Sequence, residues 1–349
     1  MTASRREFLG LTGAAALATA APRLGARQPR PTNAPIVKPP RLQPGDTIGL
    51  IEPASAGFES MPLQIAIETI EALGLKARLG AHVRERYGYL AGSDRDRADD
   101  VNRLFADPSV NGIVAVRGGW GCARLLPYLD FKTIAKHPKI LIGYSDLTAL
   151  LLPVFAKTGI VTFHGPLGVS KWNSFNVDYV RRVLFGAEAV TFENVKETND
   201  TLVQTENRIQ TITPGVARGR ILGGNLSVLS GIVGSGYLPD WSDRILFIEE
   251  VEERIYRVDR MLTQLKLAGI LDKLRGVVFG NCTKCTPGEG YGSLTLEEVL
   301  DDHIKPLGVP AWSGAMIGHI DRQFTIAEGV EVEIDAALGT IRMLEPAVS

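Results

Sequence analysis

A serine stands at a sharp corner between a short apolar run and a predicted helix. Residues 140–142 form the run, Gly143-Tyr144-Ser145-Asp146 forms the corner, and residues 147–152 are expected to be helical. Such a corner pushes a serine hydroxyl away from the sheet, and the N–H groups of the first helical turn stay free to stabilise negative charge. This geometry suits a nucleophile in acyl transfer. The usual G-x-S-x-G pattern ends here in Leu147, so a helix-capping serine remains the alternative.

A serine nucleophile needs a base, an acid that orients the base, and N–H donors for the oxyanion. His164 and His319 each occupy a glycine-flanked loop after an apolar run, whereas the other three histidines lie in charged or polar segments. Glu249 and Glu250 together end an apolar strand, and only one of them points inward because side chains alternate along a strand. Both histidines and both glutamates are therefore candidates.

The expected oxyanion donors are the N–H of Asp146 and an N–H in the turn of Gly118 and Gly119. Glycine suits this turn because it lets the backbone approach a substrate closely. The Arg-Gly-Gly-Trp-Gly stretch lacks the spacing of a dinucleotide-binding motif, so no cofactor is expected. The single C-x-x-C of Cys282 and Cys285 has no second pair or nearby histidine, so we expect no metal, and an incidental disulfide is one simple interpretation.

Apolar strands and helices alternate along residues 42–170, which predicts parallel βαβ units in one doubly wound sheet. Ligands bind at the carboxyl ends of such strands, where the three loops RGGWG, GYSD and HGP fall. We predict an N-terminal domain over 42–170, a connecting segment or flap over 171–215, and a C-terminal domain over 216–349. The alternation in residues 324–341 predicts antiparallel strands near the C terminus.

The first 35 residues have the pattern of an export signal and linker. Arg5 and Arg6 precede an apolar stretch, residues 9–21, that is too short to span a bilayer, and Ala18-Thr19-Ala20 resembles a cleavage site. The paired arginines resemble a twin-arginine (Tat) signal. We therefore expect a periplasmic protein without a stable membrane anchor after cleavage. The net charge of −1 gives no indication of a nucleic-acid partner.

These motifs together resemble the LD-carboxypeptidase family, serine peptidase family S66, which also includes the microcin C immunity hydrolases. The matching stretches occur in the family's order, from about residue 42 to the C terminus: RGGWG (117–121), GYSDLT (143–148), HGP (164–166), GGNL (223–226), LFIEE (246–250) and GH (318–319).

The resemblance implies an α/β fold, with an N-terminal flavodoxin-like domain and a C-terminal mixed α/β domain that is β-rich and of the swivelling type. It makes Ser145 the nucleophile, His319 the base and Glu249 the orienting acid. The position of Glu250 is often Asp in the family, so the choice between the two glutamates stays open. The oxyanion hole falls on Gly118 or Gly119 and Asp146. Weaker candidates for substrate binding are Arg117, Trp120, His164, Trp172 and Asn225.

The implied reaction is hydrolysis of the L,D-amide bond that releases terminal D-Ala from a murein tetrapeptide, through an acyl-enzyme. The implied partner is a peptidoglycan-derived peptide, and a homodimer is a further family implication. Characterised members are largely cytoplasmic, so the export signal is a departure. The alternatives are a microcin-C-type detoxifying amide hydrolase and a non-catalytic periplasmic peptide-binding protein.

Overall fold

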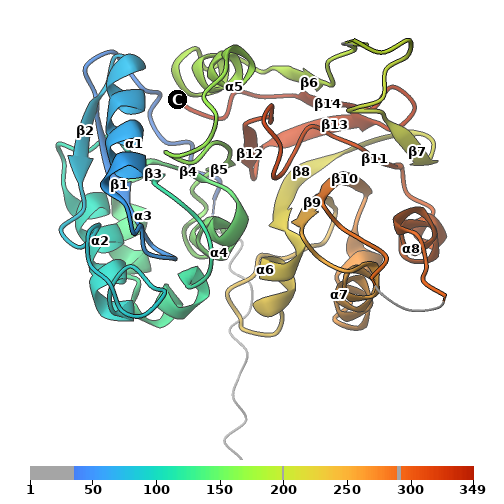
Figure 1. The fold of residues 1–349 in the computed structure, drawn as a ribbon, viewed down its shortest axis with the longest axis horizontal. Coiled ribbons are helices and arrows are strands. Elements are labelled where there is room, and N and C mark those ends of the chain that lie inside the picture. Colours follow the sequence, from blue (N-terminus) through green and yellow to red (C-terminus); the bar gives the residue numbers. More distant parts are fainter. Residues whose placement is uncertain (1–34, 199, 289–291) are drawn as a thin grey trace, which may run out of the picture. The chain divides into compact units, whose positions relative to one another are not determined.

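The computed structural model describes residues 35–198, 200–288 and 292–349, so the expected export signal lies outside the described residues. The described residues form one compact unit. Two β-sheets organise it, one built mainly from the first half of the chain and the other mainly from the second half (Figure 1).

The smaller sheet has six strands in the order β12-β5-β4-β3-β1-β2. Its five N-terminal strands are parallel, in the flavodoxin-like order, which confirms the predicted doubly wound arrangement. Strands β3 and β4 are buried along their whole length, as expected for parallel strands covered on both faces. The elements are β1 (Thr47–Ile51), α1 (Ser60–Ala72), β2 (Lys76–Leu79), α2 (Asp94–Ala106), β3 (Gly112–Ala115), η1 (Cys122–Tyr128), α3 (Phe131–Lys136), β4 (Ile140–Gly143), η2 (Ser145–Leu147), α4 (Thr148–Thr158), β5 (Thr162–His164) and β12 (Ile326–Glu328).

The larger sheet has eight strands in the order β6-β14-β13-β8-β9-β10-β11-β7. Strands β8 to β11 are parallel, and the outer strands on both sides are antiparallel, so the sheet is mixed, as expected for the C-terminal part. Its elements are α5 (Ser174–Val180), η3 (Arg181–Phe185), β6 (Thr191–Glu193), β7 (Gln210–Thr213), β8 (Val216–Asn225), α6 (Leu226–Gly231), β9 (Arg244–Val251), α7 (Ile255–Leu267), η4 (Leu271–Lys273), β10 (Gly276–Thr283), α8 (Leu296–His303), η5 (Lys305–Leu307), β11 (Ala311–Ser313), β13 (Glu331–Asp335) and β14 (Thr340–Met343).

The division of the chain differs from the expected one at two places. Strands β6 and β7 come from the expected connecting segment, yet they form the two edges of the larger sheet. Strand β12 comes from the expected C-terminal domain, yet it pairs antiparallel with β5 at the edge of the smaller sheet. These strands have only three or four residues, which is too short for a periodic pattern to reveal their partners.

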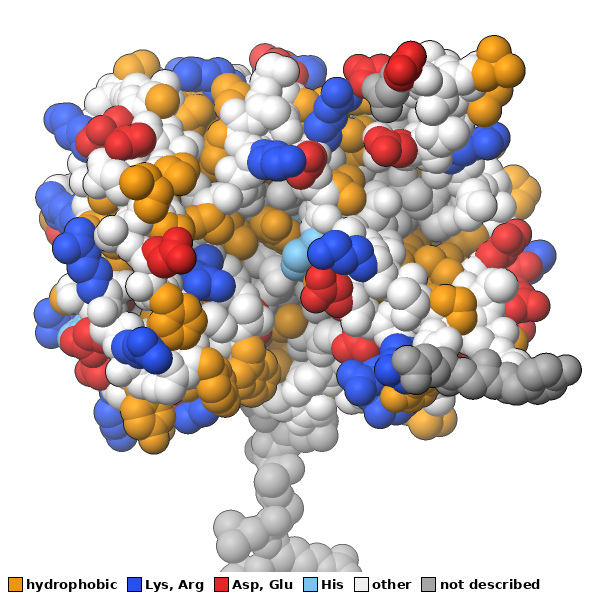
Figure 2. Space-filling view, viewed as in Figure 1, with side chains coloured by type: hydrophobic (Ala, Val, Ile, Leu, Met, Phe, Trp, Pro, Cys, Tyr) orange, Lys and Arg blue, Asp and Glu red, His pale blue; other side chains and the backbone are white. Residues whose placement is uncertain are grey.

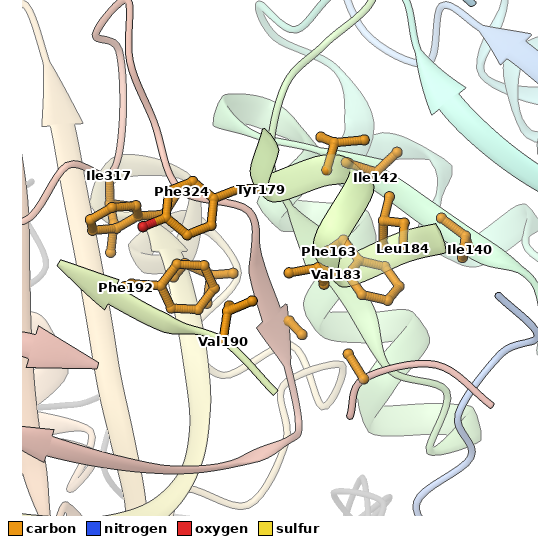
Figure 3. Close-up of a cluster of buried hydrophobic side chains, with 14 of the residues drawn as sticks. Ile140, Ile142, Phe163, Tyr179, Val183, Leu184, Val190, Phe192, Ile317 and Phe324 are labelled. Atoms are coloured by element: carbon orange, nitrogen blue, oxygen red, sulfur yellow. The ribbon is translucent and has the colours of Figure 1, made fainter. Parts of the chain in front are cut away.

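A continuous hydrophobic core joins the two sheets. Ile142 and Phe163 from the smaller sheet belong to the same cluster as Phe192, Ile317 and Phe324 from the second half of the chain (Figure 3). Burying side chains of this size contributes about 1.5–3 kcal/mol each. The two sheets therefore share a buried cluster, and two further clusters lie against other faces of the sheets.

None of the helices in the described residues is both long enough and apolar enough to cross a membrane. Cys282 and Cys285 are joined by a disulfide, whereas Cys122 is a free, buried thiol. The two bonded cysteines lie on either side of the end of β10.

Candidate active site

Ser145 lies where β4 ends and the chain turns into η2 and α4. Its φ of 64° is positive, a conformation that is uncommon for any residue other than glycine and that concentrates at functional sites. The corner is tight: a Cβ on Gly143 would come within 2.8 Å of the Leu147 side chain. Ser145 is the first residue of η2, Tyr144 precedes it as the N-cap residue, and the Ser145 hydroxyl contacts His319. The helix-capping alternative is therefore wrong.

His319 connects Ser145 to Glu249. Its Nε2 is 3.0 Å from the Oγ of Ser145, and its Nδ1 is 2.8 Å from Oε2 of Glu249. A carboxylate only accepts hydrogen bonds, so Nδ1 carries the proton and Nε2 is left to accept from the hydroxyl. Glu249 is fully buried near the end of β9, and His319 is partly exposed in the loop after β11. The structure thus brings together the three residues that the family resemblance selected.

A glycine beside His319 makes this contact possible. Gly318 has a φ of +114°, and a Cβ there would come within 2.6 Å of Oε2 of Glu249. Any other residue would strain the backbone and push against the carboxylate that orients the imidazole. The Gly-His pair in the sequence therefore has a direct steric explanation.

Two environments act on the His319 imidazole. Burial lowers the pKa of His319, but the hydrogen bond and the charge of Glu249 outweigh it, so the pKa lies above its ordinary value. The Tyr144 ring packs edge-on against the imidazole, with 4.9 Å between ring centroids. Sequence reasoning missed Tyr144 as a site residue, although its place in the Gly-Tyr-Ser-Asp corner was a usable signal.

Glu250 points away from His319, as strand alternation requires, yet it is as buried as Glu249. The expectation that only one of the two glutamates faces the interior is therefore wrong, because both faces of β9 are covered. It accepts hydrogen bonds from the backbone N–H of Ser227 at 2.8 Å and from Nδ2 of Asn225 at 3.1 Å. Burial raises the pKa of Glu250, although its backbone hydrogen bonds oppose the shift. The contact geometry thus separates the two glutamates that the sequence could not distinguish.

The Gly118-Gly119 turn lies directly beside Ser145. A Cβ on Gly118 would be 3.3 Å from the Cβ of Ser145, and Gly119 has a φ of +114°. Within the described residues, neither glycine donates its N–H to a hydrogen bond. The N–H of Asp146 belongs to the first turn after the corner, where helical N–H groups lack internal partners. These are the positions expected for oxyanion donors.

The Asp146 side chain has a separate, structural role. It is fully buried, and its Oδ2 accepts the Cys122 N–H at 2.7 Å. This bond ties the start of η1, just after the Gly118-Gly119 turn, to the Ser145 corner. Burial raises the pKa of Asp146, while the hydrogen bonds from Cys122 oppose that shift.

Two cavities open on either side of Ser145. The larger, the His319 cavity, has a volume of about 510 Å³ and includes Arg117 and His319 in its lining. The smaller, the Glu250 cavity, has about 370 Å³ and includes Glu250 and Glu253. Ser145 and Gly119 line both. On the face in Figure 2, a histidine is visible near the centre, with hydrophobic side chains on one side of it and charged side chains on the other. The serine is thus positioned to meet a substrate that extends both ways.

The weaker binding candidates divide into two groups. Arg117 lines the His319 cavity, and Trp120 and Asn225 line the Glu250 cavity. The expectation that His164 contacts substrate is wrong, because its ring is fully buried beneath the site, and burial lowers its pKa to about 4. Trp172 lines neither cavity, and its Nε1 donates to a backbone oxygen at 3.0 Å. Glycine-flanked loops mark strand ends, but they do not reveal which side chains fold inward.

A possible ligand set for a metal ion lies elsewhere. His82, Glu85 and Asp96 place one ligand atom each within 4.8 Å of one another near the start of α2. Groups of this kind are common without an ion, and this one takes no part in the geometry around Ser145. The Ser145 site itself is built from N–H groups, a hydroxyl, an imidazole and carboxylates.

Comparison with known proteins identifies the family. Models of the LD-carboxypeptidase N-terminal and C-terminal domains match residues 48–165 and 218–334. A probable murein peptide carboxypeptidase of Bacillus subtilis is 36% identical over 89% of this chain and 95% of its own length. The microcin C7 self-immunity protein MccF of Escherichia coli is 30% identical over 84% of this chain and 92% of its own length. A structure of MccF in complex with glutamyl sulfamoyl guanosine superposes with a TM-score of 0.80 at 27% identity, covering 89% of this chain and 99% of that one. The chain belongs to the LD-carboxypeptidase family of serine peptidases.

Proposed function

We propose that this protein is an exported serine carboxypeptidase that hydrolyses the L,D-amide bond before the terminal D-Ala of murein tetrapeptides. The observation that carries the proposal is the pair of contacts made by His319, 3.0 Å to the Ser145 hydroxyl and 2.8 Å to Glu249. Relatives named as murein peptide and murein tetrapeptide carboxypeptidases support the substrate class.

The contacts define a role for each residue in catalysis. His319 takes the Ser145 proton at Nε2 while Oγ attacks the carbonyl carbon, and Glu249 stabilises the imidazolium that forms. The N–H groups of Asp146 and of Gly118 or Gly119 bind the oxyanion, where losing one donor typically costs about 2.7–4 kcal/mol. His319 then protonates the leaving amine, and a water molecule repeats the sequence on the acyl-enzyme.

The position of the His319 imidazole relative to Ser145 determines which way the substrate lies across the site. His319 must protonate the leaving nitrogen, and of the two cavities only the larger is lined by His319. The leaving residue therefore enters the His319 cavity, and the residue that becomes acylated enters the Glu250 cavity. The carboxyl groups of Glu250 and Glu253 line that second cavity, and Glu253 also pairs with Arg257 at 3.4 Å. Carboxyl groups there favour the amine-bearing third residue of a murein peptide, meso-diaminopimelate or lysine.

Release of D-Ala from a purified tetrapeptide tests the proposal. The wild-type protein releases D-Ala, and Ser145→Ala binds the peptide without releasing it. A substitution remote from both cavities, Arg84→Gln, is the matched control because Arg84 is exposed and makes no ion pair within the described residues. Binding without release by the wild type would instead support the non-catalytic binding protein.

A microcin-C-type amide hydrolase is the second candidate. It is supported by the MccF relative and by the solved complex of MccF with glutamyl sulfamoyl guanosine. The acidic Glu250 cavity argues against an acidic aminoacyl group in this chain. The test measures the rates at which the protein cleaves glutamyl sulfamoyl adenosine, its lysyl analogue and the murein tetrapeptide. Faster cleavage of the glutamyl compound than of the murein tetrapeptide would favour this second function.

Export to the periplasm is part of the proposal. The Arg5-Arg6 pair and the apolar stretch after it support a twin-arginine signal, and the Cys282–Cys285 disulfide suits an oxidising compartment. Fractionation of cells that carry the full chain and the Arg5→Lys/Arg6→Lys double variant tests this. We expect the wild type in the periplasm and the variant in the cytoplasm; cytoplasmic wild type would contradict export.

A further inference from the structure

We propose that the His319 cavity selects a leaving D-amino acid with an apolar side chain larger than that of alanine, and that Arg117 recognises its free carboxylate. This inference rests on the proposed carboxypeptidase function and adds the class of leaving residue. It begins from the size, the charge and the apolar wall of the cavity that His319 lines.

The cavity is larger than a leaving alanine needs. Alanine would bring one methyl group and one carboxylate into a cavity of about 510 Å³. Volumes of this order are typical of sites that enclose whole small ligands. The acylated part of the peptide enters on the other side of Ser145, so it does not fill this space. A bulkier leaving residue occupies more of it than alanine does.

The wall of the cavity is apolar where a side chain would lie. Phe58 and Pro62 line one part of it, and Leu167 and Val169 line another. Phe58 and Val169 are 63% and 40% exposed, large values for hydrophobic side chains beside a catalytic serine. Covering them with an aliphatic side chain would remove apolar surface from water, at about 25 cal/mol per Å². The cavity thus gains affinity from a leucine-like or methionine-like residue that alanine cannot supply.

Arg117 provides the charge that a free carboxylate needs. It follows β3 and directly precedes Gly118, so its guanidinium lies in the lining next to the expected oxyanion donors. One N–H group, at Nη1, donates to the Ala56 oxygen at 2.8 Å, which positions the side chain. Within the described residues Arg117 forms no salt bridge, so its other donors remain available to a bidentate carboxylate.

Glu52 offers a competing explanation for Arg117. The Glu52 carboxylate lines the same cavity, accepts the Gly57 N–H at 2.9 Å, and interacts electrostatically with Arg117. Arg117 would then only hold the loop between β1 and α1. A structural arginine affects acids and amides equally, whereas a carboxylate receptor distinguishes them. The ratio of the cleavage rates of a peptide acid and its amide therefore distinguishes a carboxylate-binding Arg117 from a structural one.

The first experiment varies the leaving residue. Tetrapeptides ending in D-Ala, D-Met and D-Leu are compared by kcat/KM, with the released amino acid measured by chromatography. We expect D-Met and D-Leu to exceed D-Ala, and Val169→Phe, which fills the cavity, to reverse that order. Faster release of D-Ala than of both larger residues by the wild type would overturn the size inference while leaving the carboxypeptidase function intact.

The second experiment varies the terminal charge. The wild type should cleave the D-Leu acid at least about tenfold faster than the D-Leu amide, the effect of one charge-assisted contact. Arg117→Gln should remove most of this preference, Arg117→Lys should restore part of it, and Arg84→Gln should leave it unchanged. Equal rates on acid and amide by the wild type, or a preference that survives in Arg117→Gln, would overturn the role of Arg117. If no tetrapeptide in the series is cleaved, the proposed function itself fails.

Discussion

The two halves of the catalytic geometry are constructed in different ways. Ser145 obtains its position from a few consecutive residues, through a positive φ between the fully buried β4 and the buried start of α4. Glu249 and His319 are 70 residues apart and meet only because β9, β10 and β11 lie side by side. The nucleophile is thus set by local backbone geometry, and the base and acid by long-range packing.

Around Glu249 and His319, glycines make the close approach possible, whereas at Ser145 the strained corner does so. A Cβ on Gly280 of β10 would come within 2.6 Å of the Ile317 oxygen, and one on Gly318 within 2.6 Å of Glu249. Because neither glycine has a Cβ, the chain around His319 can approach the end of β9. The comparison teaches that substitutions near Ser145 and near His319 should fail for different reasons.

The largest expected effect comes from removing either side of the contact between Ser145 and His319. Ser145→Ala and His319→Ala should each lower kcat by about 10⁶-fold, the loss known for triads that act as a unit. The double variant should be no slower than either single variant. Steady-state kinetics on the tetrapeptide measure these values, with circular dichroism to verify folding. Multiplicative losses in the double variant would mean that the two residues act independently.

The next effect distinguishes the two glutamates. Glu249→Gln should lower kcat by about 10⁴-fold, because an amide no longer fixes the imidazole tautomer or stabilises its charge. Glu250→Gln is the comparison, since Glu250 bonds to Ser227 and Asn225 instead of His319, and its place in the second cavity bears on KM more than on kcat. We expect a much smaller loss for Glu250→Gln, and comparable losses would contradict the geometry.

Glu249→Gln should also change the pH dependence of activity. His319 acts as a base only when neutral, so activity rises as the pH increases through its pKa, which lies above the ordinary value of 6.5. Glu249→Gln removes the negative charge that raises this pKa and weakens the hydrogen bond, so burial, which lowers the pKa, is opposed mainly by the charges of Glu250 and Glu252. The acidic limb of the kcat/KM profile should therefore move to lower pH. An unchanged limb would show that another group controls it.

A smaller effect is expected from the glycine before the histidine. Gly318→Ala should lower kcat/KM by about 10²-fold, the order of loss for a misplacement of about 1 Å. Gly308→Ala is the matched control: Gly308 also has a positive φ, of +66°, but a Cβ there would meet nothing within 4 Å. It should cost stability alone, about 1–2 kcal/mol. Equal losses of activity in both variants would point to backbone strain as the cause.

This contrast also explains how much could be predicted from the sequence. The Ser145 corner is local, so its strand, turn and helix could be predicted from consecutive residues, as could the parallel order of the smaller sheet. The choice of Glu249 over Glu250 needed the family resemblance, because alternation says only that one of them faces inward. His164 lies next to a glycine in an expected loop, as His319 does, but in the structure it ends β5 and is buried against the Tyr144 and Phe247 rings, contacts that the sequence does not show.

Short strands limited the prediction most. Strand β12 has three residues, and nothing in their pattern indicates that they would leave the larger sheet to pair with β5. Its last residue, Glu328, is fully buried, and neither carboxylate oxygen has a hydrogen-bond partner within the described residues. A sequence pattern would have assigned this glutamate to the surface.

The smallest expected effect concerns the stability of the protein and the buried Glu328 at the end of β12. Burial raises the pKa of Glu328 well above its ordinary value of 4.5, so the folded protein keeps a proton that the unfolded chain releases. The stabilisation is complete below the unfolded pKa and is lost as the pH rises toward the folded one, by up to about 1.4 kcal/mol per pH unit. Thermal unfolding between pH 5 and pH 8 should show wild-type stability decreasing more steeply than that of Glu328→Gln. Glu297→Gln, an exposed glutamate of α8, is the matched control and should follow the wild type. If the stability of the wild type and of Glu328→Gln falls equally with pH, the pKa of Glu328 is not raised, and the carboxyl group has hydrogen-bond partners in solution.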